Sequence, residues 1–224
     1  MQNPASSSRS RKIAASASLG ALAVILSQVP LPAFPFLFLR IDLAEVIDVL
    51  SFLLLGPSWG LLTLLIHWFG LNLLPSFLPI IGPFMKLLAV LSMFLGFWIT
   101  GKIWRMLVKR KGSGKFFLGL LVLNGALVRV AVMALANFLL FAFLLPETYF
   151  PVLTAALEKL SLILEAAIGL KIVVTSDLQA VWISVGILSI YNAIHVLVSM
   201  IPAYFLLKGI LKTPAGKILN SWEK

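Results

Sequence analysis

The sequence predicts an all-α membrane protein, a bundle of six transmembrane helices. Of its 224 residues, 61% are hydrophobic and only 12% are charged, and the mean hydropathy of +1.06 lies far outside the range of soluble domains. Its apolar runs are separated by proline, glycine or charge, and each span needs roughly 20 apolar residues to cross a hydrocarbon core about 30 Å thick. The length therefore suits one helical bundle and leaves no room for a second, soluble domain.

A short polar tail precedes the first predicted span. Residues 1–12 are Ser-rich and basic, and the apolar run Ile13–Val29 that follows ends at Pro30. A signal peptide has a similar layout, but no small-residue cleavage site precedes Pro30 and more spans follow. We therefore interpret 1–12 as a cytoplasmic tail and 13–30 as a retained first helix.

Proline and glycine set the limits of the second and third spans. A Pro-rich loop over 30–39 leads to a short helix over 42–56, which stops at Gly56-Pro57. That turn carries the chain directly into a third helix over 58–74. The next loop contains Pro75, Pro79 and Pro83.

Three long spans and one surface helix are predicted in the second half. The fourth span covers 84–108 and ends at a basic tract, the fifth covers 116–145, the sixth covers 179–211, and a second cytoplasmic tail follows over 212–224. Between the last two spans, in 146–178, leucines recur at helical spacing alongside charged residues. This pattern predicts an amphipathic helix on the membrane surface.

Charge placement predicts the orientation. Thirteen of the 18 cations lie in the N-terminal tail, the 102–115 region and the C-terminal end, whereas seven of the eight acids lie in the opposite loops and helix ends. Cations next to membrane spans mark the cytoplasmic side. We therefore expect a multi-pass protein of the cell membrane with both termini in the cytoplasm, and the net charge of +10 does not indicate nucleic acid.

Ionisable residues inside the predicted spans are candidate functional residues, because they are costly in a bilayer unless they are paired or hydrated. Asp42, Glu45 and Asp48 recur every third residue at the outer end of the second span, where Arg40 and Lys86 are possible partners. A solvated helix end is the alternative interpretation. His67 on the third span is more typical of a packed or interfacial residue than of a ligand.

A second polar set lies on the fifth and sixth spans. Arg129 lies roughly 20 Å of helix rise from the cytoplasmic end, and counting back from Lys208 places His195 at the same level. Asn192 lies one turn from His195, and Asn137 lies two turns beyond Arg129. The alternative to a functional site is a hydrogen-bond network that holds helices together, worth about 1 kcal/mol per bond.

Several chemistries are absent from the sequence. Without cysteine there is no disulfide and no Cys-ligated metal. The chain also has no His-Glu-x-x-His zinc motif, no Gly-x-Ser-x-Gly elbow, no P-loop and no repeated halves. We therefore predict no catalytic residue, metal ligand or cofactor, and any energised transport must take its energy from partner subunits.

Four stretches carry a resemblance to a known family. They are Leu39-Arg-Ile-Asp-Leu-Ala-Glu45, the turn Leu55-Gly-Pro-Ser-Trp-Gly60 with Asn72 after it, Arg129-Val-Ala-Val-Met133 through Asn137-Phe138, and Tyr191-Asn192. Together they resemble the substrate-binding S components of energy-coupling factor (ECF) vitamin transporters, in particular the riboflavin-type members. The resemblance covers most of 13–211.

The resemblance implies a vitamin-binding subunit that works with a transmembrane coupling subunit and two ABC-type ATPases. It places the vitamin, with riboflavin as the first expectation, near the outer face under the first loop. Ala17 and Ala21 match a motif that docks on the coupling subunit, and we assign Arg129 a structural role because it lies deeper than the expected pocket. The expected ligand contacts are Asn192, His195, Asn137, Lys86, Glu45, Phe38 and Tyr149.

Departures from the riboflavin-type pattern leave the substrate open. The chain has Val46-Ile47-Asp48 where those members usually have a proline, His195 where they have a lysine, and Phe84-Met85-Lys86 in place of an acidic and amide pattern. Another vitamin, such as thiamine, pantothenate or a queuosine precursor, is one alternative. A membrane-embedded enzyme or assembly factor that uses Arg129 and His195 is an alternative of a different class.

Overall fold

The computed structural model describes residues 4–29, 31–32, 40–74, 79–107 and 114–219, and almost all of them are helical. The elements in chain order are α1 (Pro4–Leu26), β1 (Leu31–Pro32), β2 (Arg40–Ile41), α2 (Ala44–Leu55), α3 (Pro57–Asn72), α4 (Ile81–Leu107), α5 (Gly114–Leu139), the π-helical turn η1 (Leu140–Leu144), α6 (Pro146–Ile168), α7 (Asp177–Leu211) and α8 (Pro214–Leu219). The two short strands pair antiparallel, with Leu31 opposite Ile41.

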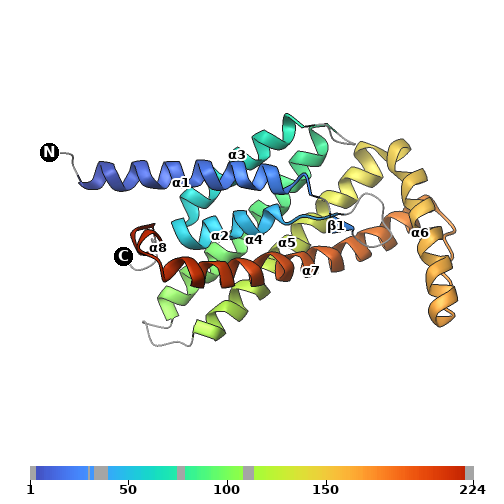
Figure 1. Ribbon diagram of the computed structural model, residues 1–224. Helices are drawn as coiled ribbons and strands as arrows, with labels where there is room; N and C mark the ends of the chain where they lie inside the picture. Colours follow the sequence, from blue (N-terminus) through green and yellow to red (C-terminus); the bar gives the residue numbers. More distant parts are fainter. Residues whose placement is uncertain (1–3, 30, 33–39, 75–78, 108–113, 220–224) are drawn as a thin grey trace.

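The long helices run back and forth along the molecule (Figure 1). Both chain ends lie at the left of that view, and the ends of α4 and α5 that flank residues 108–113 lie on the same side. The helix α6 and the β1–β2 pair lie toward the opposite end. The closest neighbours are α4 with α5, α5 with α7, and α1 with α3.

Among the described residues, three helices are long and apolar enough to cross a membrane: Ile81–Met106, Phe116–Leu144 and Asp177–Leu211. They correspond to the fourth, fifth and sixth predicted spans. The helices α2 and α3 have only 12 and 16 residues, a rise of about 18 and 24 Å against the roughly 30 Å of a hydrocarbon core. The described residues thus support a helical membrane protein with three helices that can cross a membrane, and the first three predicted spans stay a prediction.

Two segments differ from the sequence expectation. The helix α1 begins at Pro4, not at Ile13, so most of the predicted tail is helical. Arg9 and Arg11 are exposed on this first part, as expected for turns that project from the apolar body into water. In the predicted surface segment, α6 buries Leu153, Leu157 and Leu160 and exposes its charged side chains, so the helix is amphipathic as expected but packs on α7.

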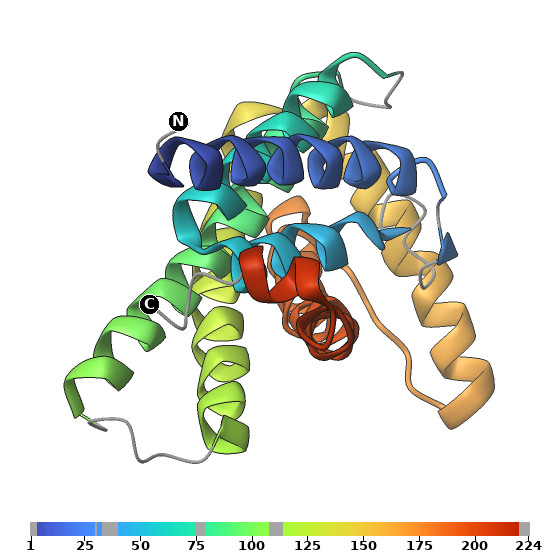
Figure 2. The same ribbon diagram turned by 60° about the vertical axis from the view of Figure 1, so that its left-hand side comes forward.

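The helix α2 lies at the centre of the bundle. All 12 of its residues are buried, and Figure 2 shows α1 on one side of it and α7 on the other. Gly56, with a positive φ of 94°, ends this helix and lets the chain turn directly into α3. Every polar side chain of α2 must therefore find its partners inside the protein.

Glycine allows α4 and α5 to approach closely. A Cβ added to Gly96 would lie 2.5 Å from the Asn124 carbonyl oxygen and 2.8 Å from the Gly125 Cα. Beside this contact, the Asn124 amide donates to the Thr100 hydroxyl at 2.9 Å. Small residues let membrane helices pack backbone against backbone.

Gly96→Val is expected to lower the free energy of unfolding by about 1–3 kcal/mol, because the new side chain overlaps the α5 backbone. Thermal unfolding in detergent, followed by size-exclusion chromatography, measures the loss. Gly119→Val on α5 is the matched control, since a Cβ there meets nothing within 4 Å. Equal stability of the two variants would contradict the close α4–α5 packing.

Candidate functional site

Glu45 is the centre of a buried charged network that joins four helices. It lies in the first turn of α2, and its side chain is 1% exposed. Its Oε1 accepts from Lys86 Nζ of α4 at 2.5 Å, and its Oε2 accepts from Arg129 Nη1 of α5 at 2.6 Å. From α7, His195 Nδ1 lies 2.7 Å from Oε2 and the Ser199 hydroxyl donates to the same oxygen at 3.3 Å.

All three guanidinium nitrogens of Arg129 donate hydrogen bonds in this network. Its second terminal nitrogen donates to Glu45 Oε1 at 3.2 Å, so the pair is bidentate, and its Nε donates to Asn192 Oδ1 at 2.9 Å. Asn192 in turn donates to the Leu188 carbonyl at 2.9 Å. The arginine that the sequence placed deep in the bundle is therefore paired with a carboxylate from a different helix.

The hydrogen bonds of His195 fix its tautomer. Its Nε2 accepts from the Asp42 backbone N–H at 3.3 Å, so the ring proton is on Nδ1 and is donated to Glu45. The ring of Tyr191 lies 5.3 Å from the His195 ring, centroid to centroid.

Lys86 and Asp42 form the most accessible part of the network. Lys86 Nζ lies 2.9 Å from Asp42 Oδ2, and each side chain is 18% exposed. Asp42 Oδ1 also accepts from the Ala44 N–H at 2.8 Å, at the start of α2. The two carboxylates balance Lys86 and Arg129, so the network is neutral and its members bond one another. Its geometry is that of an anchor between α2, α4, α5 and α7.

A second buried pair joins α2 to α3. Asp48 Oδ2 lies 2.9 Å from His67 Nδ1, and both side chains are 0% exposed. The other two polar atoms, Asp48 Oδ1 and His67 Nε2, have no hydrogen-bond partner among the described residues. Sequence reasoning treated His67 as a packed residue and missed this pair, because the partner lies on another helix and no spacing rule connects the two.

Two buried polar residues, Asn137 on α5 and Ser184 on α7, have no side-chain hydrogen bond among the described residues. Asn137 is 7% exposed and makes no side-chain hydrogen bond within the described part of the chain, and the fully buried Ser184 hydroxyl also lacks a partner there. These helices run antiparallel (Figure 1). Because Arg129 bonds Asn192, counting eight residues along each helix brings Asn137 and Ser184 to one level. Sequence reasoning did not select Ser184.

A buried apolar and aromatic cluster is formed by residues close in sequence to Asn137 and Ser184. Leu140 and Phe141 pack with Tyr149, Val181 and Val185 in one buried cluster. The Phe141 and Tyr149 rings lie 4.6 Å apart, centroid to centroid, and burial raises the pKa of the Tyr149 hydroxyl, which stays a neutral donor. The π-helical turn η1 begins three residues after Asn137, and such turns are frequent at functional sites.

The predicted site residues thus fall into separate groups. Glu45, Lys86, Asn192 and His195 bond within the network around Arg129, whereas Asn137 and Tyr149 lie at the apolar level nearer α6. Phe38 lies outside the described residues. Ala17 and Ala21 are exposed on α1, as an intermolecular contact requires. In the described ranges, no group of three or more His, Cys, Asp or Glu is placed to hold a metal ion.

The fold and this site define a helical membrane protein with a buried, neutral network of charged side chains at its centre. No protein-family model, curated protein or solved structure matches the chain.

Proposed function

We propose that the chain is the substrate-binding membrane subunit of an ATP-driven vitamin importer, an S component of the ECF type. In this proposal α1–α5 and α7 are the six spans, and both termini face the cytoplasm at the cell membrane. The back-and-forth course of these helices and the position of both chain ends on one side support that arrangement. The short α2 is shielded from lipid by its neighbours, so it need not match the bilayer thickness.

The observation that carries the proposal is the pair of unpartnered polar side chains, Asn137 and Ser184. Buried polar groups are normally hydrogen-bonded, so the unpaired Ser184 hydroxyl and the Asn137 amide at the same level of the bundle suit a ligand that supplies the partners. Apolar walls with a few placed polar groups are typical of small-molecule sites. The aromatic rings beside them favour a flat heterocycle, with riboflavin or a related flavin first.

The charged network around Glu45 supports the same function by holding the helices in place. It ties α2, α4, α5 and α7 together and has no charged group left over, so it provides a rigid floor rather than ligand contacts. The alternative of an enzyme using Arg129 and His195 has less support, since both side chains are already bonded to Glu45. The exposed Ala17 and Ala21 suit contact with a coupling subunit, which would bring two ATPases.

The first experiment identifies what copurifies with the protein. We expect denaturation of the detergent-purified protein to release a vitamin-sized molecule with the mass and visible absorption of a flavin. Asn137→Leu should reduce the amount released at least tenfold, because a buried hydrogen bond to the ligand is lost. A different vitamin-sized mass would change the substrate and keep the transporter.

Asn124→Leu is the matched control for that experiment. It lies on the same helix, but its side chain already bonds Thr100, so the change should affect stability and not ligand content. Absence of any copurified ligand, together with no binding when vitamins are titrated, would contradict the proposed function. Equal ligand content in the two variants would show that Asn137 does not contact the ligand.

A further inference from the structure

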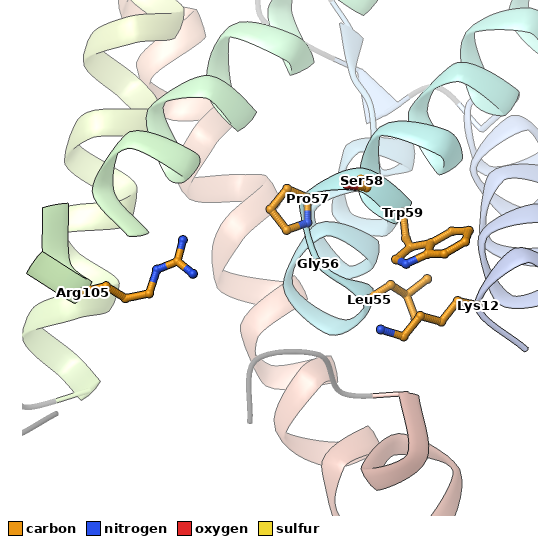
Figure 3. Close-up of a pocket in the computed structure, with 7 residues that line it drawn as sticks. All are labelled: Lys12, Leu55, Gly56, Pro57, Ser58, Trp59 and Arg105. Atoms are coloured by element: carbon orange, nitrogen blue, oxygen red, sulfur yellow. The ribbon is translucent and has the colours of Figure 1, made fainter. Parts of the chain in front are cut away.

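A pocket of about 280 Å³ lies at the turn between α2 and α3, far along α2 from Asp42 and Glu45. Figure 3 shows the side chains around it, contributed by α1, by the α2–α3 turn and by α4. The lining residues are Lys12, Leu55, Gly56, Pro57, Ser58, Trp59 and Arg105. The proposed function does not use this pocket.

Two cations approach the pocket from opposite sides. Lys12 comes from α1 and Arg105 from α4, with the α2–α3 turn between them (Figure 3). Neither forms an ion pair with an acid in the described ranges, and Arg105 uses only its Nε, which donates to the Gly101 carbonyl at 3.2 Å. The Lys12 ammonium and the outer guanidinium nitrogens therefore remain available to an anion.

The backbone of the turn supplies further donors. Pro57 is the first residue of α3 and has no N–H, and Gly60 N–H is the first to bond back, to the Gly56 carbonyl at 2.9 Å. The Ser58 and Trp59 N–H groups have no acceptor among the described residues. Together with the cations they make the lining of the pocket complementary to a phosphate group.

The residues around the pocket are of the kinds that are typical of a membrane interface. Trp59 lines it, and Trp98 and Trp104 lie on the same end of α4, where Lys102 lies 5.3 Å from the Trp98 ring centroid. Tryptophan and cations gather at the headgroup level of membrane proteins. Apolar side chains on the neighbouring helix surfaces, Leu61, Ile103 and Met106, are 40%, 41% and 63% exposed, so a ligand with a charged head and apolar tails suits this surface.

We infer that this pocket binds the phosphate of an anionic phospholipid, with Lys12 and Arg105 as the charged contacts. Basic pockets between membrane helices recognise such headgroups. A free phosphate ion has the same donor requirements, but it has no tails for the exposed apolar surface. The inference requires the protein to lie in a membrane and does not depend on which ligand it transports.

Native mass spectrometry of the delipidated protein tests the site. Phosphatidylglycerol should bind to the wild-type protein in preference to phosphatidylcholine. The double variant Lys12→Gln/Arg105→Gln should weaken phosphatidylglycerol binding roughly 30-fold, the effect of removing two surface cations. The variant Lys12→Arg/Arg105→Lys should retain most of the binding.

The control variant also removes two positive charges at the end of the molecule where the pocket lies. Lys208→Gln/Lys212→Gln lies outside the pocket and should leave phosphatidylglycerol binding within about twofold of the wild type. Equal weakening in this control would show general charge attraction and overturn the site, as would unchanged binding in the pocket variant. Inorganic phosphate that binds as tightly as the lipid would overturn the lipid assignment.

Discussion

Glu45→Gln is expected to destabilise the protein by about 3–5 kcal/mol, because it leaves the buried Arg129 guanidinium without a carboxylate. Lys86 would retain Asp42, so the excess positive charge stays at Arg129 in the middle of the bundle. The loss is measured as the shift of thermal unfolding in detergent. Glu147→Gln, an exposed acid at the start of α6, is the control and should have little effect.

Substitution of Arg129, the partner of Glu45, tests whether this residue serves stability or ligand binding. Arg129→Leu alone should also destabilise, since Glu45 and Asp42 then face only Lys86, and Glu45→Gln with Arg129→Leu should recover part of the loss. If Arg129→Leu kept full stability and lost the ligand, Arg129 would be a ligand contact and its structural assignment would be wrong.

His67→Leu has the second large expected effect, again about 3–5 kcal/mol, because Asp48 then lies fully buried without its only hydrogen-bond partner in the described part of the chain. The double variant Asp48→Leu/His67→Leu should recover most of the stability, since replacing both partners of a buried polar pair by apolar side chains leaves no group unpaired. Chemical or thermal unfolding in detergent gives both values.

The double variant also tests whether the pair has a role besides stability. Thr63→Val, which removes a neighbouring hydrogen bond of α3 to Ser51, controls for any loosening of the α2–α3 contact. Retained stability of His67→Leu would contradict a stabilising contact between Asp48 and His67. A stable double variant that no longer binds ligand or supports uptake would instead show that Asp48 and His67 serve function directly.

Much of the fold follows from local signals. Gly56-Pro57 separates α2 from α3 because glycine takes the positive φ and proline suits the first turn of a helix. The leucine spacing of 146–178 predicted an amphipathic helix, and α6 has that character. Of the six predicted spans, the last three match described helices that are long and apolar enough to cross a membrane. The first three stay a prediction, because hydropathy does not distinguish a lipid-facing helix from one enclosed by other helices.

The site was predictable in its members more than in its pairings. The free-energy cost of an ionisable side chain in a bilayer identified Glu45, Arg129 and His195 as candidates. The sequence suggested Lys86 and Arg40 as partners for the acids, however, and did not connect Arg129 to Glu45. Such contacts join residues 84 and 150 positions apart, and helical spacing carries no information at that range. Ser184 and His67 were missed for the same reason, since only the packed structure shows whether a buried side chain has a hydrogen-bond partner on another helix.

The position of α2 has a consequence for biogenesis. Its carboxylates are made early, whereas the side chains that neutralise Glu45 lie on α4, α5 and α7, the last of them 150 residues later. A short helix with two acids is a poor independent insertion unit. The charged network around Glu45 can therefore be completed only after α7 has been synthesised.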